Sequence, residues 1–213
     1  MFDTTKARDQ VSELAPTRPA EAFRVARQIA DPWFAVQALA WVGRYAPADM
    51  SATALGEARA TARAGRDAYQ RSAVLAWPIR AAIETANGAA AAMMLAEACA
   101  LLPKVRPAAS RAEAAGLLLE AAFPGGRGLW EPILAVIEAH CPPGNDWRTW
   151  RLYRTLAHIV AVEDPEAARR LVAAIPPGKA RDRAEKELAN GAIVSPRAFF
   201  GGGSTVYPTR EAR

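Results

Sequence analysis

The sequence predicts an all-α protein, specifically a right-handed α-solenoid of about five helical hairpins with an extended C-terminal tail. Three observations lead to this fold class. Alanine, which has the highest helix propensity, makes up close to a quarter of the 213 residues. No stretch alternates apolar and polar residues with the period of two that is typical of strands. Residues 57–82 also resemble residues 21–46 without any gap, which indicates an internal repeat.

The repeat contains matched residues that an alanine-rich composition does not explain. A tryptophan recurs at the same position, as do a glutamate, two arginines, an aspartate and a leucine. These pairs are Glu21/Glu57, Arg27/Arg63, Asp31/Asp67, Leu39/Leu75, Trp41/Trp77 and Arg44/Arg80. The glutamate recurs less clearly at Glu97, Glu131 and Glu166. Because its spacing stays between 34 and 40 residues, each repeat is long enough for two helices.

Each repeat consists of two helical runs separated by a break with proline, glycine or aspartate, as in AGRD, LPKVRP and IPPGK. Such residues end helices or cap the next one. Over residues 19–190, the pattern EA..(V/L)A..I.D....A.ALA resembles the degenerate helical-hairpin repeats of tetratricopeptide-like and HEAT-like arrays. The residues of the tetratricopeptide signature do not occur in order. The resemblance therefore implies a fold class and carries no functional residues over to this chain.

The expected elements follow in order along the chain. A lead-in helix over 4–15 belongs to an N-terminal segment, 1–18, and a helical-repeat domain spans 19–191. The helix pairs of this domain are expected at 19–30 and 33–46, 51–65 and 68–86, 88–102 and 107–122, 130–140 and 146–162, and 164–175 and 178–190. Pro78 directly follows Trp77 and predicts a kink or a break near Ala76.

Two of the repeated residue types have a structural explanation. The glutamate is expected in the first turn of the first helix of each pair, where a carboxylate faces the positive end of the helix dipole. Asp164-Pro165-Glu166 fits this arrangement, with aspartate as the N-cap and proline as the first helical residue. Trp41 and Trp77 are expected in the core between repeats, and a ligand cage is the alternative.

The tail, residues 192–213, differs in kind from the repeats. Its sequence, AIVSPRAFFGGGSTVYPTREAR, has no helical pattern and does not continue the repeat. Phe199, Phe200 and Tyr207 are apolar anchors on either side of a glycine linker, whereas a purely solvated tail would be poor in aromatic residues. Two interpretations follow, a disordered C-terminus or an extended arm that docks on another chain or folds back on the helices.

No combination of residues predicts catalysis, a metal site or a cofactor site. His140 is adjacent to Cys141, so their side chains diverge and cannot form a nucleophile–base pair, and His158 is flanked by apolar residues. Zinc-ligand spacing is absent. The glycine-rich stretches 124–128 and 201–205 lack the GxxxxGK[ST] pattern of a phosphate-binding loop. We therefore expect no cofactor and no enzymatic activity. An enzyme built from scattered carboxylates and arginines remains an alternative.

An arginine stripe is the first candidate partner-binding surface. Arg59, Arg63 and Arg66 are spaced four and three residues apart, which places them on one face of a helix, and Arg27 is the repeat equivalent of Arg63. The stripe predicts a groove for an acidic or extended segment of another protein. A solvated face with local ion pairs and a HEAT-like array that binds nucleic acid are the alternatives. Nucleic acid is disfavoured because the net charge is only +5 and residues 192–213 contribute +2 of it.

Two tryptophans in the stretch NDWRTWRLYR are the second candidate. Trp147 and Trp150 are three residues apart and share a helix face, with arginines beside them. Such a face either packs on a neighbouring helix or contacts a partner, where tryptophan and arginine often dominate the binding energy.

The predicted function is a non-enzymatic protein–protein interaction or assembly module, in effect a scaffold. Its partner, another protein, is bound through the solenoid groove, the tail or both, and the tail would attach the chain to a larger complex. No apolar run reaches the ~18 residues that a membrane span requires. The N-terminus lacks the layout of a secretory signal, and the two cysteines form no disulfide framework. These features predict a cytoplasmic protein that does not bind membranes.

Overall fold

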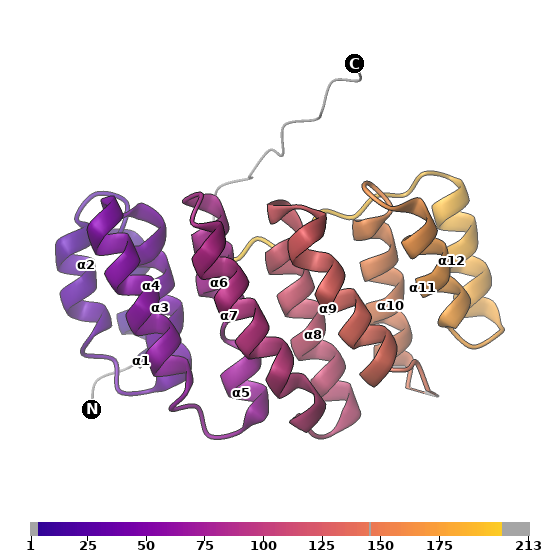
Figure 1. Ribbon diagram of the computed structural model, residues 1–213, viewed down its shortest axis with the longest axis horizontal. Helices are drawn as coiled ribbons and strands as arrows, with labels where there is room; N and C mark the ends of the chain where they lie inside the picture. Colours follow the sequence, from indigo (N-terminus) through magenta and orange to yellow (C-terminus); the bar gives the residue numbers. More distant parts are fainter. Residues whose placement is uncertain (1–3, 145, 202–213) are drawn as a thin grey trace, which may run out of the picture.

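The computed structural model describes residues 4–144 and 146–201, and in this part of the chain it contains helices and no strand (Figure 1). The first six α-helices are α1 (Thr4–Leu14), α2 (Pro19–Ala26), α3 (Pro32–Tyr45), α4 (Ala48–Ala62), α5 (Ala68–Ala73) and α6 (Ala76–Glu84). The next six are α7 (Gly88–Leu101), α8 (Ala108–Ala122), α9 (Arg127–His140), α10 (Trp147–Val160), α11 (Pro165–Ala174) and α12 (Lys179–Ala189). The all-α fold class is thereby confirmed.

Several helices begin directly after the breaks that the sequence predicts, where an aspartate caps them. Asp31 accepts hydrogen bonds from the N–H groups of residues 33 and 34 at the start of α3, and Asp67 accepts one at the start of α5. Asp164 does the same for α11, with Pro165 as the first helical residue. The expected break near Ala76 is also present, since α5 ends at Ala73 and α6 starts at Ala76.

The prediction for the recurring glutamate is wrong at three of its five positions. Glu21 and Glu166 do lie in the first turns of α2 and α11. Glu57 and Glu97, however, lie in the C-terminal halves of α4 and α7, because these helices begin earlier in the chain, at residues 48 and 88. Glu131 lies in the second turn of α9. A role toward the helix dipole therefore explains only part of the repeat.

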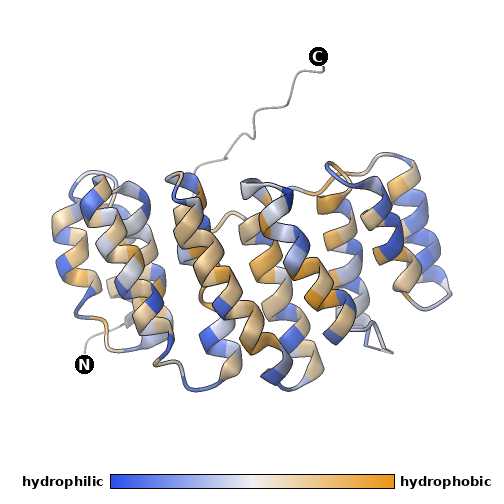
Figure 2. Ribbon diagram, viewed as in Figure 1, coloured by the Kyte–Doolittle hydropathy of each residue, from blue (hydrophilic) through white to orange (hydrophobic). Residues whose placement is uncertain are grey.

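The helices lie side by side in a row that follows the order of the chain (Figure 1). α3 packs against α1, α4 and α6, α6 against α7 and α8, α8 against α9 and α10, and α10 against α11. Small residues allow this close packing. For example, Gly43 faces the side chain of Leu55 and Gly116 that of Leu152, at distances that leave no room for a larger residue without displacing the leucine. Polar residues cover the last helix, α12, which buries only Ala184 (Figure 2).

Candidate partner-binding site

The C-terminal segment, residues 192–201, folds back on the helices and has no helix or strand of its own. It leaves the end of α12 and runs back along the row toward α6 (Figure 1). On α8, Glu120 anchors it, because the backbone N–H of Arg197 donates a hydrogen bond of 2.6 Å to the carboxylate. Of the two interpretations of the tail, the arm that folds back describes this part. Tyr207 lies outside the described residues.

The two phenylalanines of this segment pack on the two repeated tryptophans. The ring of Phe199 lies 5.4 Å from that of Trp77 at an interplanar angle of 85°, and Phe200 lies 5.1 Å from Trp41 at 81°. Edge-to-face geometry of this kind is favourable for aromatic pairs. Phe199 and Phe200 are only 6% and 4% exposed. The repeat thus produces two equivalent aromatic surfaces on α3 and α6, and the segment places one phenylalanine on each.

The sequence predicts Trp41 and Trp77 in the core, but the structure buries both rings only in part. Both pack against the core with part of their surface exposed. Trp77 also contacts the edge of Trp33 at 5.8 Å, and Trp33 stacks on Tyr69 at 6.0 Å. Burial, together with the nearby Glu113 carboxylate, raises the pKa of Tyr69, so the phenol stays neutral. A connected set of uncharged aromatic rings therefore lies beneath the phenylalanines.

Arg44 completes the site around Phe200. Its guanidinium carbon lies 4.9 Å from the centre of the Phe200 ring, within the range of a cation–π contact. Glu84 pairs with Arg44 and also accepts a 2.6 Å hydrogen bond from Arg80, the repeat equivalent of Arg44. We call Trp41, Arg44, Trp77 and Glu120 the tail-docking site. The repetition of Arg44 and Arg80 in the sequence could have indicated Arg44, whereas no sequence pattern distinguishes Glu120 or Glu84.

The arginine stripe is occupied by ion pairs between helices that are neighbours in the repeat. Arg27 pairs with Glu57 through two nitrogens. Arg59 and Arg63 both reach Glu97, with N–O distances of 2.7 Å each. Hydrogen bonds from the arginines lower the pKa of both glutamates, which keeps the carboxylates ionised at neutral pH. The arginine of one copy of the sequence repeat therefore contacts the glutamate of the next copy.

Arg66 does not continue the stripe. α4 ends at Ala62, four residues earlier, so Arg66 lies in the turn that leads to α5 and is exposed. Its backbone N–H donates to the side chain of Gln70. The expected shared helix face of Arg59, Arg63 and Arg66 is wrong for Arg66, because the helix ends before that residue.

Trp147 and Trp150 at the start of α10 have different environments. Trp147 is 59% exposed, and the guanidinium of Arg148 lies 5.6 Å from its ring. Trp150 is partly buried against the core and donates a hydrogen bond from Nε1 to the carbonyl of Gly144. Only Trp147 presents its ring to the surroundings, so the two do not form one exposed aromatic face.

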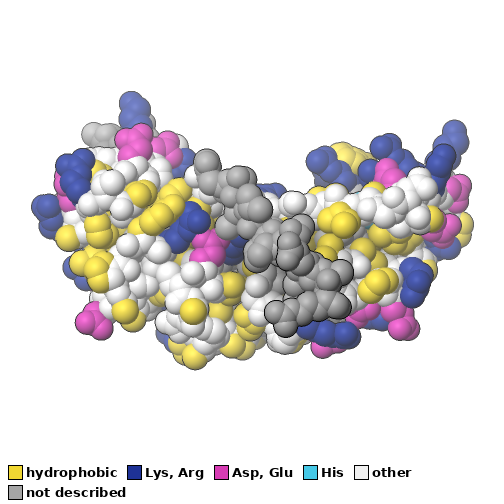
Figure 3. Space-filling view, turned by 90° about the horizontal axis from the view of Figure 1, so that it is seen from above, with side chains coloured by type: hydrophobic (Ala, Val, Ile, Leu, Met, Phe, Trp, Pro, Cys, Tyr) yellow, Lys and Arg dark blue, Asp and Glu magenta, His cyan; other side chains and the backbone are white. Residues whose placement is uncertain are grey.

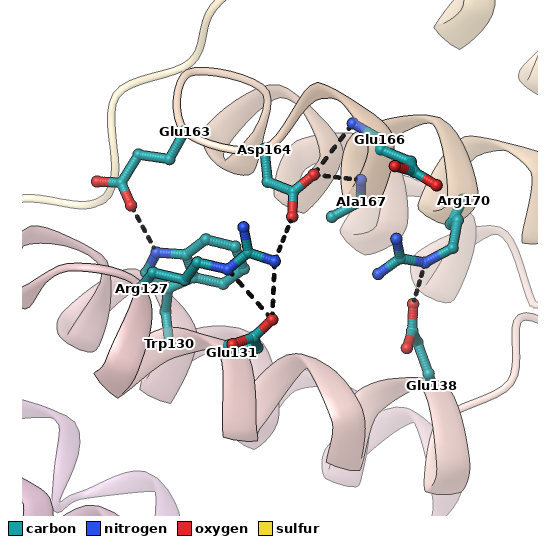
Figure 4. A network of polar contacts seen from close by, with 9 residues as sticks. All are labelled: Arg127, Trp130, Glu131, Glu138, Glu163, Asp164, Glu166, Ala167 and Arg170. Carbon is teal, nitrogen blue, oxygen red and sulfur yellow. Dashed lines mark hydrogen bonds and ion pairs between the residues drawn. The ribbon is translucent and has the colours of Figure 1, made fainter.

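A polar network joins the beginning of α9 to that of α11 (Figure 4). Arg127 pairs with Glu131 on its own helix and with Asp164 at the N-cap of α11, both at 2.9 Å. Trp130 donates a 2.9 Å hydrogen bond from Nε1 to Glu163. Backbone hydrogen bonding, first from Ala167, lowers the pKa of Asp164, so that the cap stays ionised. These contacts fix one helix on the next.

The histidines and cysteines show no arrangement for catalysis in the described residues. His140 is exposed at the end of α9. Burial raises the pKa of Cys99 to about 11 and also raises that of Cys141, so both thiols stay protonated and are weak nucleophiles. Across residues 4–144 and 146–201, no group of three or more His, Cys, Asp or Glu side chains is placed to hold a metal ion.

His158 is buried in α10, and its burial leads us to expect that the stability of the protein depends on pH. It is 3% exposed, and Nε2 lies 3.6 Å from a carboxylate oxygen of Glu187. Burial lowers its pKa below the ordinary value, which Arg154 reinforces and Glu187 opposes. The unfolded chain then binds a proton more readily than the folded one. Stability is therefore expected to fall as the pH drops below about 6.5, the ordinary histidine value, until it passes the lower folded pKa.

The free energy of unfolding can be measured by chemical denaturation between about pH 8 and about pH 5, a range that includes the ordinary histidine pKa. H158Q is expected to flatten the curve in that range, whereas H140Q, which changes an exposed histidine, should keep it. A curve that H158Q leaves unchanged would assign the effect to another group.

Within the described residues, no helix combines the length and the apolar character needed to cross a membrane. No protein-family model matches the chain, and neither a curated protein nor a solved structure matches it significantly. The candidate site therefore stands on its own geometry.

Proposed function

We propose that this chain is a non-enzymatic protein–protein interaction module of the cytoplasm. In this proposal the helices form a right-handed α-solenoid of about five hairpins, related in kind to tetratricopeptide-like and HEAT-like arrays, whose groove binds an extended protein segment. The observation that supports it best is the burial of Phe199 and Phe200 on Trp77 and Trp41. A segment without regular structure is held there by side-chain anchors, as in peptide recognition.

The burial of Phe199 and Phe200 is expected to contribute as much free energy as the anchor residues of a protein interface. Burying a phenylalanine side chain contributes roughly 1.5–3 kcal/mol. Aromatic residues in pockets are also the side chains that most often dominate protein interfaces. The two tryptophans that contact the phenylalanines are part of two packed helices, α3 and α6, so the surface is preorganised and little ordering is needed on that side.

Nucleic acid is the weaker alternative. Arg27, Arg59 and Arg63 are each paired with a glutamate, which reduces the field that they could direct at phosphates. On the face shown in Figure 3, away from the atoms drawn in grey, Lys and Arg side chains are interspersed with Asp and Glu. A binding surface for an acidic or extended protein segment fits this mixed charge better than one for a phosphate backbone.

The proposal can be tested with a peptide added to a variant of the full chain. In F199A/F200A the internal segment loses its two anchors. The peptide AIVSPRAFFG, which has the sequence of residues 192–201, is expected to bind this variant saturably with a Kd in the micromolar range, measured by calorimetry. The same peptide with both phenylalanines replaced by alanine is the control. If both peptides bind equally, or neither binds, the surface is not a recognition site.

A further inference from the structure

We propose that the segment 192–201 occludes the tail-docking site. We further propose that the natural ligand of this site is an extended protein segment with a basic residue two positions before two adjacent aromatic residues. This inference rests on the function proposed above and adds to it a partner chemistry and a form of regulation. It follows from three contacts of the internal segment, which occur in order at Arg197, Phe199 and Phe200.

The basic position is defined by acidic groups on the helices. The backbone N–H of Arg197 donates to Glu120, and Nε of its side chain lies 3.9 Å from the same carboxylate. The Glu120 side chain is only 13% exposed. Glu113 is a second carboxylate of α8 and, in addition to burial, it raises the pKa of Tyr69. A positive charge in the ligand is therefore favoured at this point.

The two aromatic positions are defined by the repeat. Trp77 and Trp41 occupy equivalent places on α6 and α3, which pack directly against each other. Adjacent residues of an extended chain can therefore reach both rings. Edge-to-face packing and the contact of Arg44 with the Phe200 ring both require an aromatic π-system, which an aliphatic side chain lacks. The site thus selects a pair of aromatic residues.

Occlusion follows from burial and from the way the segment is held. With Phe199 and Phe200 almost fully buried, the tryptophans have no room for a second aromatic pair. Residues 193, 194, 195, 197 and 198 are exposed, so the segment depends on a few anchors near its end. Only a short connection joins the segment to α12. Its effective concentration at the tail-docking site is therefore high, and it competes strongly with any other ligand of that site. Loss of the two phenylalanine contacts is enough to open the site.

The experiment compares the binding of the peptide AIVSPRAFFG to the wild-type chain and to F199A/F200A, both at full length. We expect the variant to bind at least about 10-fold more tightly, because the wild-type segment must first be displaced. Replacing arginine by glutamate in the peptide should weaken its binding to the variant about 10-fold, since a carboxylate would then face Glu120. Adding W77A to the variant should abolish binding and locate the site.

The outcomes separate this inference from the proposed function. Equal affinity of the wild-type chain and the variant would overturn occlusion and leave the interaction module standing. No binding to either would overturn both. Equal affinity for the arginine and glutamate peptides would overturn the basic position. A wild-type dimer that F199A/F200A converts to a monomer in size-exclusion chromatography would show that the occupant is the segment of a second copy.

A second variant covers the case in which F199A/F200A does not fold, as judged by circular dichroism. Arg197 has an exposed side chain, so R197E leaves the apolar contacts intact but places a negative charge next to Glu120. It should loosen the internal segment and tighten the binding of the peptide, by a smaller factor than the double substitution. An affinity unchanged from wild type would count against occlusion.

Discussion

Replacement of Trp130 by alanine is expected to lower the free energy of unfolding by about 3–5 kcal/mol. Trp130 is completely buried in α9, where its ring lies 6.0 Å from that of Phe123. Its Nε1 group also donates to Glu163 in the turn before α11. The substitution removes the largest fully buried side chain of the described residues and leaves a cavity. Urea denaturation followed by far-UV circular dichroism measures the loss.

Trp147→Ala is the matched control for this prediction. It removes the same side chain from a helix position that is 59% exposed, so the free energy of unfolding should change by only about 0.5 kcal/mol. Trp130→Phe should lower the free energy of unfolding less than Trp130→Ala. Phenylalanine also loses the hydrogen bond to Glu163, but it keeps most of the buried volume. A loss below about 1 kcal/mol for Trp130→Ala would mean that the surrounding helices close the cavity at little cost.

Glu84→Ala is expected to cost about 3 kcal/mol, because it breaks a buried ion pair. The Arg80 side chain is 2% exposed and that of Glu84 is 16% exposed, so water screens the pair weakly. Glu84 also pairs with Arg44, which holds Arg44 next to the Phe200 ring. The substitution should therefore destabilise α6 and, in addition, loosen the C-terminal segment. Chemical denaturation measures the loss of stability. Limited proteolysis within residues 192–201 measures the loosening of the segment.

Glu131→Ala serves as the control for Glu84→Ala. Glu131 pairs with Arg127 at the same i, i+4 spacing and in the same order as Glu84 with Arg80, but both side chains are more than half exposed. Exposed pairs contribute little and are screened by salt, so the change in stability should be far smaller. If Glu131→Ala and Glu84→Ala cost the same, burial would not be the reason for the importance of Glu84.

The helices could be predicted because their signals are local. Asp31, Asp67 and Asp164 satisfy backbone N–H groups within three residues, and the break before Ala76 needs only the nearby Pro78. The repeat also identified the tryptophans and arginines that matter for the candidate site. The predicted start of α4 is three residues too late, whereas the predicted start of α7 is correct. The error for the recurring glutamate arose from its place within these helices, since Glu57 and Glu97 lie far from the first turn.

Contacts between repeats could not be predicted in the same way. Arg27 and Arg63 occupy one position of the repeat, and Glu57 and Glu97 occupy another. Nothing in the sequence indicates that these two positions contact each other. Their pairing depends on how far one helix is displaced along another, which the packing of the helices decides. The same holds for Arg44 and Glu84, which come from different helices.

The sequence by itself determined the helical class, the order of the helices and the presence of aromatic anchors in a tail that does not continue the repeat. Only the tertiary structure decided that Phe199 and Phe200 lie on Trp77 and Trp41. Helix propensity and capping act over a few residues along the chain. Burial of an aromatic side chain depends instead on which surface the folded chain brings to it, and here that surface comes from residues far away in the sequence.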